Sequence, residues 1–141
     1  MAPYSTMSNT GLRNLGAVVL FTLAMGSMPA KADLLLECNE TAGSINKTTP
    51  QAIDKVTTLL NSVCFQDGRT VTLQYRNKLD VPPGSVDQGK INTLKPTMVN
   101  AWCTDPTQRK ILKLVNIQYT YSDASGRFLG KVDIANRECR S

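Results

Sequence analysis

The chain of 141 residues contains no histidine. Serine–histidine–aspartate sites, cysteine–histidine sites and histidine-ligated metal centres all require an imidazole, so the sequence excludes these three classes of chemistry. Aromatic residues are scarce, at 6%, and only 19% of the residues are charged, whereas 41% are hydrophobic. This hydrophobic fraction excludes a disordered chain, and the length is that of one compact domain.

Motifs for other kinds of chemistry are missing as well. The sequence has no Cys-x-x-Cys redox pair, no glycine-rich phosphate loop and no Gly-x-Ser-x-Gly elbow. The remaining candidates for catalysis are four aspartates beside predicted loops: Asp80, Asp87, Asp123 and Asp133. Two carboxylates can hydrolyse a glycosidic bond only when they face one cleft at a defined spacing. Because aspartate is favoured in turns for capping its own backbone, we expect no catalytic, cofactor-binding or metal-binding residue.

The N-terminus has the pattern of a targeting segment. Residues 15–25 (LGAVVLFTLAM) are apolar, follow the basic Arg13 and precede Ala30-Lys31-Ala32, which has the A-x-A form of a cleavage site. The run is shorter than the stretch of about 20 residues that crosses a bilayer. It therefore predicts a signal peptide over residues 1–32, the alternative being a buried N-terminal helix or an uncleaved anchor.

Removal of the signal peptide would leave residues 33–141 as a single compact domain, periplasmic or secreted. Translation starts at Met1 or at Met7, because either start gives a complete signal. Cys38 follows leucine and glutamate, not the small residues that precede a lipidated cysteine. We therefore expect no stable membrane anchor.

The charge of the chain does not point to nucleic acid. The sequence has 16 basic and 11 acidic residues, a net +5, and loss of Arg13 and Lys31 with the signal would leave +3. The densest basic group, Arg109, Lys110 and Lys113, falls on a predicted helix, where a solvated face is the simplest interpretation. We expect no nucleic-acid partner, and no strongly basic amphipathic helix supports a membrane-active toxin.

All four cysteines lie beyond the predicted signal peptide: Cys38, Cys64, Cys103 and Cys139. An even number in a short exported chain predicts two disulfides, for which three connectivities are possible. We favour Cys38–Cys64 and Cys103–Cys139, because each pair joins neighbours in the sequence and closes one half of the domain. A zinc site is disfavoured, because it would show close cysteine pairs or histidines.

The first half of the domain predicts a mixture of elements. Residues 34–36 predict a short strand, and the polar residues 39–48 predict a loop. A helix is predicted from Pro50 to Val63, because apolar residues recur there at steps of three and four. Residues 70–75 alternate between apolar and polar side chains, which predicts a strand. The apolar stripe of the predicted helix consists of Ile53, Val56, Leu59, Leu60 and Val63.

The second half predicts helices followed by a hairpin. Residues 81–84 contain two prolines and predict a loop, while helices are predicted at about 96–103 and at 105–114. Strands are predicted at 115–121 and 128–134, joined by a short polar loop. This order predicts an α+β fold: an antiparallel three- to four-stranded sheet with helices packed on one face, and two disulfides.

One part of the chain resembles known families. The segment 102–106 (WCTDP), the strand with Tyr119 and Tyr121, Gly126 and the closing Cys139 resemble small exported α/β proteins of Gram-negative bacteria. These include quorum-sensing-regulated virulence factors and the β-type pilotins of type II secretion. The resemblance covers about 40 residues and is structural. It implies an exported α/β fold and assigns no functional residue.

Tyrosines are the candidate binding residues. Tyr119 and Tyr121 occupy alternate positions of one predicted strand and project to the same side, and Tyr75 lies on another strand beside Arg76. On a sheet face without helices they would form a binding platform, and beneath helices they would be core. The apolar alternation continues unbroken from Val115, which favours the core interpretation.

These observations favour a small exported, non-enzymatic interaction protein of the bacterial envelope. The expected partner is another envelope or secreted protein, and the role is that of an accessory factor, an immunity or inhibitor protein, or a secreted virulence-associated factor. The alternative is a small exported aspartate-dependent hydrolase. The position of the aspartates separates the two, because a hydrolase needs two carboxylates converging in one pocket.

Overall fold

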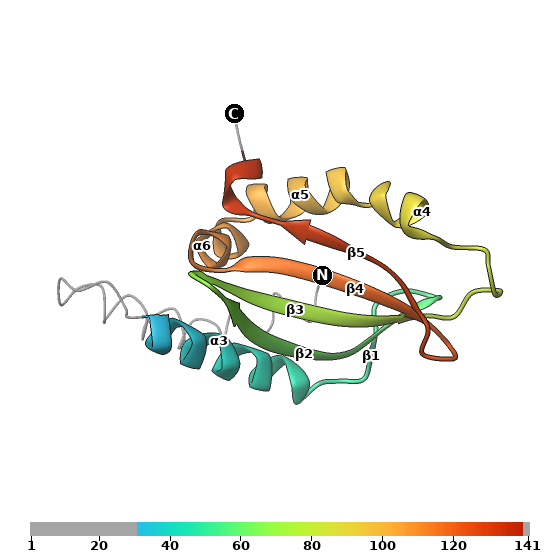
Figure 1. The fold of residues 1–141 in the computed structure, drawn as a ribbon, viewed down its shortest axis with the longest axis horizontal. Coiled ribbons are helices and arrows are strands. Elements are labelled where there is room, and N and C mark those ends of the chain that lie inside the picture. The colour runs from blue at the N-terminus through green and yellow to red at the C-terminus, as the bar shows by residue number, and fades with distance from the viewer. Residues whose placement is uncertain (1–30, 140–141) are drawn as a thin grey trace.

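The computed structural model describes residues 31–139 (Figure 1). Its five strands form one sheet in the order β1-β2-β3-β4-β5. All neighbouring strands are antiparallel except β3 and β4, which pair in parallel. The elements in chain order are α3 (Lys31–Asn46), β1 (Gln51–Ala52), β2 (Thr57–Asp67), β3 (Thr70–Leu79), α4 (Gln88–Asn92), α5 (Lys95–Thr104), α6 (Pro106–Leu114), β4 (Asn116–Asp123), β5 (Phe128–Ile134) and the 3₁₀-helix η2 (Asn136–Glu138).

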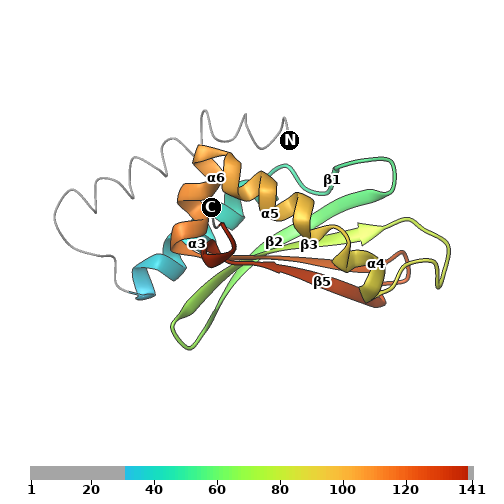
Figure 2. The same cartoon turned by 90° about the horizontal axis from the view of Figure 1, so that it is seen from above.

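The parallel pair explains where the helices lie. Two parallel strands need a long crossover connection, and the chain between β3 and β4 provides it with α4, α5 and α6. Figure 2 shows these three helices and α3 on the same side of the sheet. In Figure 1, α3 follows the β2 edge of the sheet, whereas α4 and α5 follow the β5 edge. The helices therefore flank the middle strands on one face.

The core lies between this face and the helices. Leu73 on β3, Ile117 on β4 and Ile134 on β5 are at most 1% exposed. They form one buried cluster with Trp102 on α5 and Leu112 on α6. Complete burial of a large apolar side chain stabilises the fold by roughly 1.5–3 kcal/mol. The alternate residues of the same strands form the opposite face, where amides link the strands. There the Gln74 amide donates to Gln118 (2.6 Å), and the Gln118 amide donates to Asp133 (2.8 Å).

Both predicted disulfides are confirmed. Cys38–Cys64 joins α3 to β2, and Cys103–Cys139 joins α5 to the residue that follows η2. The predicted helices at 96–103 and 105–114 correspond to α5 and α6. Asp105 is the N-cap of α6, where its carboxylate accepts hydrogen bonds from the backbone N–H groups of Thr107 and Gln108.

The helix predicted from Pro50 to Val63 is wrong, because β1 and most of β2 occupy this segment. The reason is a β-bulge in β2 between Leu59 and Asn61. The extra residue places Leu59 and Ser62, three positions apart, on the same buried face. Of the predicted apolar stripe, Leu59 is buried, whereas Leu60 and Val63 are 39% and 38% exposed, so the stripe does not form one buried face.

The short strand predicted at 34–36 and the loop predicted at 39–48 are also wrong, because α3 runs through both segments. Among residues 33–46 of this helix, three are fully buried, namely Cys38, Ala42 and Ile45. They follow the i, i+4, i+7 spacing of one helix face, but two of them are small, so the segment has the composition of a loop.

The predicted sheet was correct in class and wrong in detail. The fold is α+β with two disulfides, but the sheet has five strands, not three or four, and it is mixed, not purely antiparallel. The signal peptide predicted over residues 1–32 lies almost wholly outside the described residues. Within residues 31–139, no helix combines the length and the apolar character needed to span a membrane.

Candidate functional site

The helix-bearing face of the sheet contains an apolar groove of about 630 Å³. Its volume lies in the range of about 300–1,000 Å³ that is common for ligand pockets. The three middle strands form its floor with Leu59, Tyr75, Asn77, Leu79, Tyr119 and Tyr121. Helices α4 and α5 and the turn between them form one wall, with Ile91, Leu94, Met98 and Trp102. The β1–β2 segment forms the other, with Ile53 and Val56.

The parallel register of β3 and β4 builds an aromatic cluster in this floor. Tyr75 and Tyr119 are direct partners in the register, and their rings stack with centroids 5.0 Å apart. Trp102 closes over them from α5, with its ring centroid 6.4 Å from that of Tyr75. The indole N–H of Trp102 donates to the Tyr119 hydroxyl at 2.8 Å, which fixes both rings.

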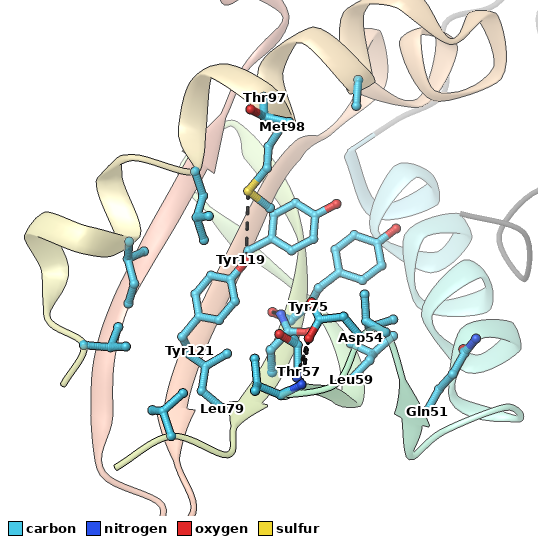
Figure 3. Close-up of a pocket in the computed structure, with 18 of the residues that line it drawn as sticks. Gln51, Asp54, Thr57, Leu59, Tyr75, Leu79, Thr97, Met98, Tyr119 and Tyr121 are labelled. Atoms are coloured by element: carbon cyan, nitrogen blue, oxygen red, sulfur yellow. Dashed lines mark hydrogen bonds between the residues drawn. The ribbon is translucent and has the colours of Figure 1, made fainter. Parts of the chain in front are cut away.

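Tyr121 lies two residues beyond Tyr119 and extends the cluster toward the C-terminal end of β4. Figure 3 shows its ring beside that of Tyr119, with the hydroxyl directed at Met98 on α5; the oxygen–sulfur distance is 4.0 Å. Burial, with a smaller contribution from the negative charge of Asp54, raises the pKa of Tyr121 to about 12. Burial also raises the pKa of Tyr119, although the hydrogen bond from Trp102 opposes this shift. The floor of the groove is therefore uncharged at neutral pH.

The raised pKa of Tyr121 predicts a loss of stability in alkali. An unfolded tyrosine ionises near pH 10, whereas Tyr121 in the folded protein stays protonated to about pH 12. Its contribution is complete below pH 10 and is lost as the pH rises toward 12. We expect the wild-type protein to lose about 1 kcal/mol more unfolding free energy than Tyr121→Phe between pH 9.5 and 11, measured in urea. Equal losses in the two proteins would contradict the prediction.

The rim of the groove is apolar and exposed. Ile53 is 46% exposed, Val56 43% and Leu94 42%, although all three are large apolar side chains. Asp54 shapes the rim, because its carboxylate accepts hydrogen bonds from the N–H groups of Val56 (2.9 Å) and Thr57 (2.8 Å). The bond from Val56 is the largest effect on this group and lowers the pKa of Asp54, so the carboxylate is ionised at the rim.

The structure brings together three of the four residues that the sequence suggested for binding. Tyr75, Tyr119 and Tyr121 all line the groove, and Tyr75 and Tyr121 are 4% and 6% exposed. Arg76 is exposed and lies one position beyond Tyr75 on β3, so its side chain belongs to the opposite face of the sheet. The rim residue Leu94 was missed, because nothing in its local sequence distinguishes it from a core residue.

The four aspartates that could have formed a hydrolase site do not line the groove of the described chain. Asp87 caps α4, where it accepts a hydrogen bond from the N–H of Lys90, and Asp123 accepts from the N–H groups of Ser125 and Arg127 in the hairpin loop. These are turn and cap roles. Asp80 follows β3 as an exposed residue, and Asp133 lies on the outer sheet face beside Gln118.

Comparison with known proteins shows similarity at the level of structure only. No protein-family model and no curated protein matches the sequence. A Pseudomonas aeruginosa protein described as secreted has 12% identity and a TM-score of 0.67, over 81% of this chain and 100% of its own. The pilotin EpsS of the Vibrio vulnificus type II secretion system has 14% identity and a TM-score of 0.60, over 79% and 96%.

A third structure, the type II secretion pilotin AspS of Vibrio cholerae, has 12% identity and a TM-score of 0.54, over 77% of this chain and 94% of its own. The chain has the fold of these proteins. The resemblance to exported proteins and pilotins that residues 102–139 suggested is therefore confirmed for the fold. Identities of 12–14% assign no residue role, so the function must be argued from the groove.

Proposed function

We propose that this chain is a small exported, non-enzymatic interaction protein of the bacterial envelope, and that its groove receives an apolar segment of a partner protein. The observation that carries the proposal is the exposed apolar rim above a preformed apolar floor. Ile53, Val56 and Leu94 converge on one concavity from two walls. Apolar side chains that gather around a groove mark interaction sites, whereas scattered ones carry no such meaning.

The electrostatics of the groove support an apolar occupant. The floor presents phenol rings that stay protonated, and the charged groups Asp54 and Lys90 stand on opposite walls. A partner segment with an apolar face would bury the rim residues, and its polar flanks would meet these two charges. In this arrangement the two charges would orient the partner segment, and the apolar contact would supply most of the binding free energy.

The same geometry disfavours the hydrolase. Among the described residues, Asp54 is the one carboxylate in the lining of the groove, and it is engaged with the backbone of its own turn. A two-carboxylate mechanism needs a second acid facing the first across the cleft. The structural neighbours, a protein described as secreted and two pilotins, agree with an accessory role in export.

Site-specific photo-crosslinking in the producing cells tests the proposal. A photoreactive residue in place of Leu94 would stand on the rim of the groove. The matched control carries the photoreactive residue in place of Phe128, which is 59% exposed and does not line the groove. We expect a discrete protein adduct from position 94 and none of that mass from position 128. Peptide mapping should place the adduct in an apolar segment of the partner.

Three outcomes would contradict the proposal. Equal adducts from both positions would show that the groove has no special role. A lipid or small-molecule mass on position 94, without protein, would show that the groove holds a small apolar ligand instead of a partner protein. Substrate turnover that is lost on Asp54→Asn would support the hydrolase.

A further inference from the structure

The outer edge of β5 is closed by a side chain that imitates a strand. The Nε2 group of Gln88, the first residue of α4, donates to the carbonyl oxygen of Lys131 at 2.9 Å. The N–H of Lys131 in turn donates to Oε1 of Gln88, also at 2.9 Å. The carboxamide thus occupies both hydrogen-bonding groups that this residue presents at the edge, as a neighbouring strand would do.

The fold is adapted to this contact at two positions. Asp87 caps α4 and thereby fixes where Gln88 stands. Gly130 leaves the space that the carboxamide needs, because a Cβ at this position would lie 2.6 Å from Oε1 of Gln88 and 2.9 Å from Cδ1 of Ile91. A larger residue at position 130 would therefore displace the ends of the Gln88 and Ile91 side chains from their places beside β5.

The same arrangement recurs at the other side of the sheet. Nδ2 of Asn46, the last residue of α3, donates to the carbonyl oxygen of Ser62 at 2.8 Å, and the N–H of Ser62 donates to Oδ1 of Asn46 at 2.6 Å. Ser62 lies on β2 just beyond the short stretch that β1 covers. Exposed strand edges favour pairing between molecules, and proteins commonly block them. Two edges blocked by the same device indicate that blocking is its role.

The β5 edge is complementary to itself. The backbone groups of Lys131 face away from β4, and the two-residue alternation of a strand turns those of Asp133 the same way. If two copies of β5 paired antiparallel about Val132, Lys131 of each copy would stand opposite Asp133 of the other. The outward hydrogen-bonding groups thus match in this register. The ion pair that Lys131 and Asp133 form within each chain (3.3 Å) would be exchanged for two ion pairs between the copies.

We propose that the β5 edge is a strand-pairing surface for a second copy of this chain, and that Gln88 keeps it closed. With Gln88 in place, β5 pairs with β4 alone. When α4 is displaced, β5 of one copy pairs antiparallel with β5 of another, in the register that sets Lys131 against Asp133. The inference does not depend on what the groove binds.

The test compares Gln88→Ala with the wild-type exported protein by sedimentation velocity over a range of concentrations. We expect the mass of Gln88→Ala to rise toward twice its wild-type value at concentrations where the wild-type mass does not change. Lys90→Ala is the control, because Lys90 lies on the same helix and its ammonium group donates to the carbonyl oxygen of Ser85 (2.6 Å), not to Gln88. Its mass should follow that of the wild type.

Second substitutions identify the surface. Lys131→Pro removes an N–H that points away from β4, together with the ammonium group that would face Asp133 of the other copy. It spares the hydrogen bonds of the β4–β5 ladder, and in the Gln88→Ala background it should restore the wild-type mass. Asp133→Lys in that background sets like charges opposite each other and should also abolish pairing. A folded Gln88→Ala whose mass does not change, or pairing that survives Lys131→Pro, would overturn the proposal.

A measurement on the wild type covers the case in which Gln88→Ala does not fold. If Gln88 closes the edge, the amide hydrogen of Lys131 should exchange at least about tenfold more slowly than an open peptide group, although it lies at the rim of the sheet. Exchange at the open rate would show that the carboxamide is not seated, and would overturn the proposal as well.

Discussion

Trp102→Ala is expected to lower the free energy of unfolding by about 3–5 kcal/mol, the usual cost of truncating a large buried aromatic residue. Trp102 is the sole tryptophan of the chain and is 1% exposed. Its removal would leave a cavity between α5 and the sheet, and the hydroxyl of Tyr119 would lose the indole donor. Urea unfolding followed by far-ultraviolet circular dichroism measures the effect, since the variant has no tryptophan fluorescence.

Trp102→Phe separates packing from hydrogen bonding. It keeps an aromatic ring in the core but removes the N–H that donates to Tyr119, so we expect a smaller loss of about 1–3 kcal/mol. A loss below about 1 kcal/mol for Trp102→Ala would mean that α5 is not held by this residue, and the account of the core would fail.

Replacing Cys103 and Cys139 together by serine is expected to cost about 3–4 kcal/mol. The bond closes a loop with a sequence separation of 36 residues, and its loss frees the unfolded chain while the folded chain keeps its other contacts. The end of the chain stays attached in part, because Lys95 forms an ion pair with Glu138 at 2.7 Å. Urea unfolding of the exported variant without reductant measures the loss.

The Cys38–Cys64 pair is the matched comparison. Its separation of 26 residues predicts a cost of similar size, about 3–4 kcal/mol, for the double serine variant. The wild-type protein in reductant should lose the sum of the two. If either double variant unfolded at the wild-type urea concentration, the corresponding bond would not constrain the unfolded chain.

The parts of the fold that the sequence predicted correctly have local signals. The cap at Asp105 and the alternation in β3 and β4 depend on neighbouring residues, whereas the two disulfides followed from the number and order of the cysteines. The errors arise where the signal is not local. The bulge at Leu59 disrupts the two-residue alternation of β2, and the parallel pairing of Gln74 with Gln118 joins strands 44 residues apart in the chain. Nothing in either strand alone specifies its partner.

For the groove as well, the sequence predicted what depends on neighbouring residues and missed what depends on distant ones. The alternation of Tyr119 and Tyr121 predicts that the two rings share a face, and they do. The residues that make this face concave come from the β1–β2 segment and from α4, whose positions depend on the whole sheet. Ile53 and Val56 fit equally well into a helical stripe, so their role at the rim could not be read from their spacing.

The parallel pairing of β3 with β4, called the parallel seam, divides the described chain into two halves, and each half contains its own disulfide bond. Residues 31–79 contain the Cys38–Cys64 bond, and residues 88–139 contain the Cys103–Cys139 bond. The stacked rings of Tyr75 and Tyr119 come from different halves and meet only across this seam. Both disulfides could therefore form correctly before the two halves have packed together, and the groove would then be absent. A partner that contacts both rings would bind the fully assembled protein and not a chain whose two halves are cross-linked but not yet packed together.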